Sequence, residues 1–112
     1  MKKETIIKKI IKGEYMTEKQ LLAKTKTLFN LCLRINETTK HDAFFGLSPH
    51  VSQTKVIVYE WGWNEWNMIR KEEGEDKADE ARKRLSFYYK GDLTIGQDKV
   101  NNFIKYMKGL LV

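Results

Sequence analysis

Residues 44–66, FFGLSPHVSQTKVIVYEWGWNEW, constrain the fold of this chain most, because β-forming, turn and aromatic residues concentrate there. Two short runs of β-branched and aromatic residues flank Ser48-Pro49-His50, as in a hairpin or a pair of adjacent antiparallel strands. Three tryptophans follow within six positions. The stretch therefore predicts two paired strands followed by a cluster of aromatic side chains.

The composition is that of a single globular domain. The chain has 112 residues, of which 41% are hydrophobic and 32% are charged, a balance typical of folded domains of this size. No apolar run approaches the roughly 20 residues needed to span a bilayer, so we expect a cytoplasmic protein with no membrane partner. Cys32 has no second cysteine to pair with and lies in an apolar run, which favours a small core residue.

The first fifteen residues have two interpretations. Lys12-Gly13-Glu14 can be encoded by a purine-rich sequence resembling a bacterial ribosome-binding site, with Met16 following at the usual spacing. Residues 1–15 would then be a basic extension upstream of the true start. Alternatively, residues 3–12 form a short basic amphipathic helix. Residues 1–15 carry five lysines and two glutamates, half of the net charge of +6, and residues 16–112 are expected to form one α+β domain.

A helix is predicted to begin after Thr17, because Thr17-Glu18-Lys19-Gln20 is a capping box. Apolar residues then recur at spacings of three and four, which predicts a wide stripe that packs on a sheet. The stripe consists of Leu21, Leu22, Thr25, Leu28, Phe29, Cys32 and Leu33 or Ile35. The helix is expected to end near Asn36.

Three strands are expected over residues 43–47, 54–61 and 85–89. A second apolar stripe, beginning at Val100 and ending at Leu110 or Leu111, predicts a C-terminal helix. Packing both long helices on one face of the sheet would bury both stripes at once. The predicted fold class is therefore α+β, a three-stranded antiparallel sheet flanked by N- and C-terminal helices.

Residues 71–84 contain six acidic and five basic side chains, too many for a core segment. We interpret them as a solvated insertion between the second and third strands, either a short helix over residues 76–84 or the tip of a long hairpin. Residues 64–69 are expected to form a loop or a single helical turn. Gly62 marks a bulge or the exit from the second strand.

The sequence offers no catalytic or metal-binding pattern. His41-Asp42 are neighbours at the start of a strand, so their side chains should point apart, and His50 lies in a turn. One cysteine and two histidines fall short of the four ligands of a structural zinc site. The glycines lack phosphate-loop or dinucleotide-binding spacing. We therefore expect a protein without catalytic residues, cofactor or metal.

Protein binding is the first function that the aromatic cluster suggests. The three tryptophans cannot all point inward if the strand alternates, so at least one should be exposed. Exposed Trp, Tyr and Arg side chains dominate interface hot spots. The expected partner-binding residues are Tyr59, Trp61, Trp63, Trp66, Arg70, Arg82 and Arg84. The partner could also be a second copy of the chain, which would make a homodimer.

Nucleic-acid binding is the alternative. Aromatic side chains on a small sheet can stack on unpaired bases while basic side chains contact phosphates. The candidate residues for this function are Lys55, Tyr88, Tyr89 and Lys90. A third interpretation, in which the aromatic residues serve only the core, remains open at this point.

The segment SPHVSQTKVIVYEWGW resembles small phage and prophage proteins of Gram-positive bacteria, with a Ser-x-His-Val turn, a strand of alternating valines and a Gly-Trp pair. The match covers roughly residues 36–63 and, more loosely, the third expected strand and the C-terminal helix, with residues 71–84 as an addition to the pattern. The resemblance implies a binding protein in the host cell cytoplasm that inhibits a bacterial defence component, as anti-CRISPR proteins inhibit CRISPR effector nucleases. The partner would be a host protein or ribonucleoprotein complex. The mild positive charge argues against DNA mimicry, which needs an acidic surface.

Overall fold

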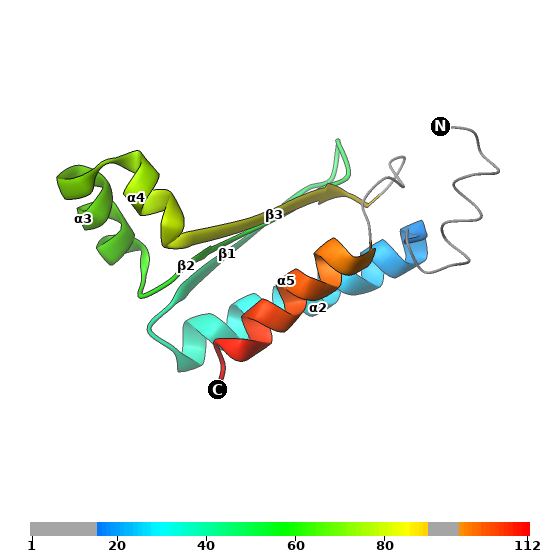
Figure 1. Ribbon diagram of the computed structural model, residues 1–112. Helices are drawn as coiled ribbons and strands as arrows, with labels where there is room; N and C mark the ends of the chain where they lie inside the picture. The colour runs from blue at the N-terminus through cyan, green and yellow to red at the C-terminus, as the bar shows by residue number, and fades with distance from the viewer. Residues whose placement is uncertain (1–15, 90–96) are drawn as a thin grey trace.

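A computed structural model describes residues 16–89 and 97–112 and confirms the predicted α+β class. The elements follow the chain as α2 (Glu18–Thr38), β1 (Asp42–Ser48), β2 (Gln53–Tyr59), α3 (Trp63–Glu73), α4 (Glu75–Glu80), β3 (Arg82–Tyr88) and α5 (Gln97–Gly109). In Figure 1, α2 and α5 lie along one face of the sheet, and α3 and α4 lie at one end of it. The helix expected over residues 3–12 and the origin of residues 1–15 lie outside the described residues.

The three strands form one antiparallel sheet in the order β1-β2-β3. The predicted hairpin is confirmed, with Phe45 opposite Val56 near its middle. β3 begins at Arg82, three positions before its expected start, so the Arg82-Lys83-Arg84 triplet belongs to the strand rather than to the charged insertion. Charged side chains are tolerated there because β3 is an edge strand of the sheet.

Helix α2 begins with the predicted capping box. The Gln20 amide donates to the Thr17 hydroxyl at 3.2 Å, and the Thr17 amide donates to Gln20 Oε1 at 2.8 Å. The helix extends to Thr38, slightly beyond the expected end near Asn36.

Five residues of the predicted stripe on α2 are buried and three are not. The buried residues of the helix are Leu21, Thr25, Leu28, Leu31, Cys32 and Ile35, of which Leu31 was not expected in the stripe. Leu22, Phe29 and Leu33, expected in the same stripe, remain 44–45% exposed. The sheet is too narrow to cover them, because β1 is its edge and no described element lies beyond it. α2 therefore carries a second, uncovered apolar strip.

The main core lies between the sheet and the two long helices. Val56 and Val58 on β2 and Leu85 on β3 are buried against α2 and α5. From α5, Val100, Ile104 and Met107 join this core. Both long helices thus cover the same face of the sheet, as predicted, and we call this the inner face.

The segment between β2 and β3 is more helical than the sequence suggested. Residues 64–69 belong to α3, a helix of 11 residues, rather than to a loop or single turn. Gly74, at a φ of +91°, then turns the chain into α4, which has six residues. This backbone conformation favours glycine. The prediction was wrong because it was based on the charged side chains of this segment. It overlooked Trp66, whose buried side chain packs α3 against α4 and the sheet.

Candidate functional site

Residues 60–63, which we call the tryptophan turn, connect β2 to α3. Trp61 has a φ of +64° and Gly62 a φ of +98°. The Gly62 amide donates to the Tyr59 carbonyl at 3.1 Å, closing the turn directly after the strand. A Cβ at Gly62 would lie 3.3 Å from the Lys40 carbonyl oxygen, so the turn also sits tightly against the start of β1.

Two side chains at the start of β1 hold this turn. The Trp61 amide donates to His41 Nδ1 at 2.9 Å, and the Trp63 amide donates to Asp42 Oδ2 at 2.7 Å. The His41 and Asp42 side chains were expected to point apart if the strand had begun at both residues, but β1 begins at Asp42, and the two side chains converge on the turn. Asp42 pairs with Tyr59, the last residue of β2, so both side chains reach the turn that follows. The Asp42 carboxylate also lies at the N-terminus of α3, where negative charge is favourable.

Trp61 is exposed and conformationally constrained. Bulky residues rarely adopt a positive φ, and such conformations cost of the order of 1–3 kcal/mol unless their surroundings enforce them. Its side chain is 67% exposed, and its ring packs on the His41 ring with 5.1 Å between centroids. The turn therefore presents a large apolar side chain to solvent on a fixed backbone.

Two more exposed aromatic residues belong to the same end of the sheet. Trp63 is 41% exposed and Phe44 is 50% exposed. Phe44 lies two residues after Asp42 on the same face of β1, and its ring meets the edge of Tyr59 at 5.4 Å. The expectation that at least one tryptophan is exposed is confirmed by Trp61 and Trp63.

Trp66, in contrast, is a packing residue. It is 9% exposed and forms a small second core with Tyr59 and Ala78. The guanidinium groups of Arg70 and Arg82 lie 5.5 Å and 4.9 Å from its ring centroid. Within the described residues its Nε1 is buried without a hydrogen-bond partner. Three of the expected partner-binding residues, Tyr59, Trp66 and Arg82, thus join α3 to the sheet, whereas the exposed Arg70 contacts Trp66 within α3.

The face of the sheet opposite the long helices, which we call the outer face, carries the seventh expected residue, Arg84. Beyond the Asp42–Tyr59–Arg82 row, this face has three cross-strand rows, and the first of them includes Ile57, which packs against the small second core. They are Phe44–Ile57–Arg84, Gly46–Lys55–Ser86 and Ser48–Gln53–Tyr88. Arg84 and Lys55 are exposed, and Tyr88 is 44% exposed. These rows contain no carboxylate, so the surface is basic and partly aromatic.

The candidates for nucleic-acid binding do not all share this outer face. Lys55 and Tyr88 lie on it in adjacent rows. Tyr89 packs against the main core on the inner side, and its amide donates to the Ser52 carbonyl at 2.9 Å. Lys90 lies outside the described residues. The outer face instead gains Phe44 and Arg84, which the sequence did not assign to this function.

Glu60, the first residue of the tryptophan turn, is bound by the C-terminal helix. The Tyr106 hydroxyl donates to Glu60 Oε1 at 2.7 Å. Burial, and then the hydrogen bond to Glu60 and its charge, raise the pKa of Tyr106 well above its ordinary value of 10.0. Sequence reasoning missed this pair, because the residues are 46 positions apart and no local pattern joins them.

The described residues include further histidine, cysteine and acidic side chains. Among them, no group of three or more histidine, cysteine or acidic side chains could hold a metal ion. Cys32 is buried, and burial raises the pKa of its thiol to about 11, so it stays protonated at neutral pH. No helix in the described part of the chain is long and apolar enough to cross a membrane.

Comparison with known proteins finds no matching family model, no matching curated protein and no matching solved structure. Within the described residues, two surfaces carry the residues that the sequence suggested for function. One is the tryptophan turn with its exposed aromatic residues, and the other is the basic outer face of the sheet.

Proposed function

We propose that this protein is a non-catalytic binding protein that captures a macromolecular partner through the tryptophan turn. The observation that carries the proposal is Trp61, 67% exposed at a φ of +64° and fixed by hydrogen bonds of its turn to His41 and Asp42. The exposed indole buries little apolar surface within the domain, and a positive φ is unfavourable for a bulky residue. Strained, well-supported conformations of this kind cluster at functional sites.

A protein surface suits this site best. Tryptophan is enriched among the few residues that carry most of the energy of an interface. Because His41 and Asp42 already hold the turn, little conformational entropy remains to be lost on binding. Trp63 and Phe44 add further exposed apolar area at the same end of the sheet.

The resemblance to phage and prophage proteins suggests the class of partner. We infer that the protein inhibits a bacterial defence component, such as a CRISPR effector nuclease, by occupying a surface of the host protein or ribonucleoprotein complex. The net charge of +6 supports contact with a protein or with bound nucleic acid rather than imitation of DNA.

Direct nucleic-acid binding is the second candidate, favoured by one specific observation. Lys55 and Arg84 lie beside Phe44 and Tyr88 on an outer face whose open rows contain no carboxylate. Single strands bind such surfaces by stacking bases on aromatic rings and placing phosphates near basic side chains. The two candidates predict different responses to mutation.

Affinity capture from lysate of the bacterial host separates them. The wild-type protein should retain a partner, and Trp61→Ala should lose it. Met68→Ala, which removes an exposed apolar side chain outside the tryptophan turn, should retain the partner. Nuclease treatment should leave this capture intact. If the bound material is nucleic acid and its retention depends on Lys55 and Arg84, the second candidate replaces the first. Retention by Trp61→Ala at the wild-type level contradicts the proposed site.

A further inference from the structure

Among the described residues, a side chain caps the unpaired edge of β1 at one position, Ala43. The Asn36 side chain donates to the Ala43 carbonyl at 2.8 Å and accepts from the Ala43 amide at 2.7 Å. It therefore occupies the place that a neighbouring strand would take. In an antiparallel strand the amide and carbonyl of alternate residues point to the same side. Phe45 and Leu47 consequently direct theirs away from β2, as Ala43 does.

These backbone groups are available for pairing. Among the described residues, no hydrogen bond reaches the backbone of Phe45 or Leu47 from outside the hairpin. An edge strand with unpaired amides and carbonyls is a template for one more strand, and proteins commonly bind extended peptides in this way. Phe45 and Leu47, two alternate residues of this edge strand, can therefore pair with the backbone of a segment of another chain.

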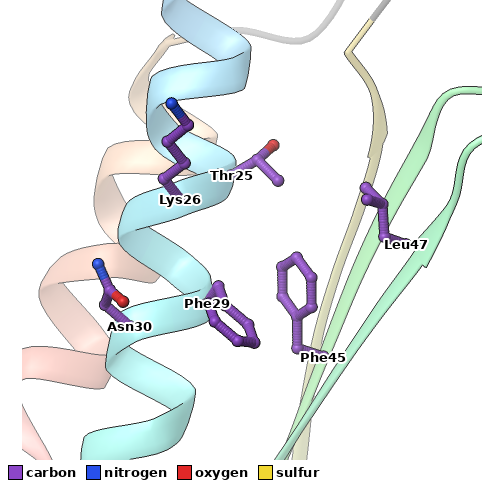
Figure 2. Close-up of a pocket in the computed structure, with 6 residues that line it drawn as sticks. All are labelled: Thr25, Lys26, Phe29, Asn30, Phe45 and Leu47. Carbon is purple, nitrogen blue, oxygen red and sulfur yellow. The ribbon is translucent and has the colours of Figure 1, made fainter.

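An apolar groove runs beside this edge. It has a volume of about 490 Å³ and is lined by Thr25, Lys26, Phe29, Asn30, Phe45 and Leu47. Figure 2 shows the Phe29 and Phe45 rings pointing toward one another between α2 and β1, with their centroids 5.2 Å apart. Leu47 and Phe29 are 49% and 45% exposed. If another strand paired with β1, those of its side chains that lie on the inner face would enter this groove.

The positive charge of Lys26 at the groove indicates what kind of segment would bind there. Lys26 is the charged residue among those that line the groove, and it also lines the adjoining hollow on α2 together with Glu18, Lys19 and Leu22. Within the described residues no carboxylate forms an ion pair with Lys26. A second copy of the chain, docked symmetrically edge to edge, would bring two α2 helices and their Lys26 side chains toward one another. A segment carrying a carboxylate would instead neutralise this charge.

We propose that β1 and α2 bind an extended, apolar segment of a partner protein that carries an acidic residue, as a fourth strand of the sheet. Its backbone pairs with Phe45 and Leu47, its apolar side chains fill the groove, and its carboxylate meets Lys26. This site is separate from the tryptophan turn and does not depend on it. Loss of Trp61 should therefore leave it unaffected.

The probe is a capped synthetic peptide, Thr-Val-Thr-Glu-Thr-Val-Thr, which reads the same in both directions. It therefore presents valine, glutamate and valine to the groove in either orientation. Titrated into isotopically labelled protein, it should bind with a Kd below about 1 mM, and it should shift the amide signals of Phe45 and Leu47 and slow their hydrogen exchange. Replacing its glutamate by lysine should weaken binding roughly threefold to tenfold, as expected for a partly exposed charge pair.

Protein variants complete the test. Lys26→Glu should reverse the preference between the two peptides, whereas Lys105→Glu, an equal charge change on α5, should not. Three results would overturn the proposal. The first is no binding at millimolar peptide, and the second is a set of shifts on Lys55, Arg84 and Tyr88 instead of the β1 edge. The third is a concentration-dependent dimer through β1 that excludes the peptide.

Discussion

The Tyr106 hydroxyl donates to Glu60 Oε1 at 2.7 Å, which joins the C-terminal helix to the first residue of the tryptophan turn. Glu60 follows β2 directly, and its amide donates to the Ala81 carbonyl at 3.0 Å. Together with the His41 and Asp42 contacts, this places three parts of the chain around one short turn. The exposed tryptophans therefore rest on a support that extends to α5.

Removing the Tyr106 hydroxyl should destabilise the domain. A hydrogen bond to a charged group is worth about 1.5–3 kcal/mol, and this one is only partly buried. We expect Tyr106→Phe to lower the free energy of unfolding by about 1–2 kcal/mol in urea denaturation. Tyr88→Phe, on the exposed outer face, is the matched control and should change it little. Equal stability of Tyr106→Phe and the wild type would show that the bond contributes nothing.

Stability should fall at alkaline pH. Burial raises the pKa of the Cys32 thiol from 9.0 to about 11, and the pKa of Tyr106 lies above its ordinary value of 10.0. In the window above pH 9 for Cys32 and pH 10 for Tyr106, the unfolded chain loses protons that the native state retains. The free energy of unfolding is therefore undiminished by these groups below pH 9, and it declines as pH rises above these values.

Thermal unfolding followed at a series of pH values checks this decline. The fall should be shallower in Cys32→Ala between pH 9 and 11, and shallower in Tyr106→Phe above pH 10. Both variants start from lower stability, so the slopes and not the midpoints are compared. A flat alkaline profile in the wild type would contradict the burial of both groups.

The three tryptophans should respond differently to truncation. Trp66 is buried against Tyr59 and Ala78, so Trp66→Ala should cost about 3–5 kcal/mol of stability. Trp63→Ala should change stability by less than about 1 kcal/mol, because exposed positions tolerate substitution. The sequence placed both tryptophans among the expected partner-binding residues, and the burial of Trp66 separates it from Trp63. Chemical denaturation of the two proteins measures the difference.

Trp61→Gly should separate stability from function. Glycine adopts a φ of +64° without strain, so this variant should be as stable as the wild type or more stable by up to about 1 kcal/mol. It should nevertheless lose the captured partner. Gly62→Ala is the opposite control and should lower stability. The alanine would have to adopt a φ of +98°, and its Cβ would lie 3.3 Å from the Lys40 carbonyl oxygen. A Trp61→Gly protein much less stable than the wild type would mean that the indole serves packing.

Much of the fold follows from local sequence patterns. The capping box at Thr17 fixes the start of α2, and the two β-rich runs around Ser48-Pro49-His50 fix the hairpin. Such signals are short-range, and the residues that create them are the residues that form the element. The second apolar stripe likewise indicated α5 and its place on the inner face.

The candidate site was only partly accessible to sequence reasoning. Alternation along β2 indicated that some tryptophans are exposed, but the strand ends at Tyr59, so alternation could not say which. The contacts from His41 and Asp42 depend on strand register, and the contact from Tyr106 depends on how α5 docks. The uncovered strip on α2 depends on the narrow sheet, a property of the assembled fold rather than of any segment.

The fluorine spectrum of the protein labelled with 5-fluorotryptophan tests partner binding at the tryptophan turn most directly. The three tryptophans give separate signals that are assigned by single substitution to phenylalanine. Addition of the captured partner, purified, should shift or broaden the Trp61 and Trp63 signals, while the buried Trp66 signal stays in place. Unchanged Trp61 and Trp63 signals at saturating partner would contradict binding at the tryptophan turn.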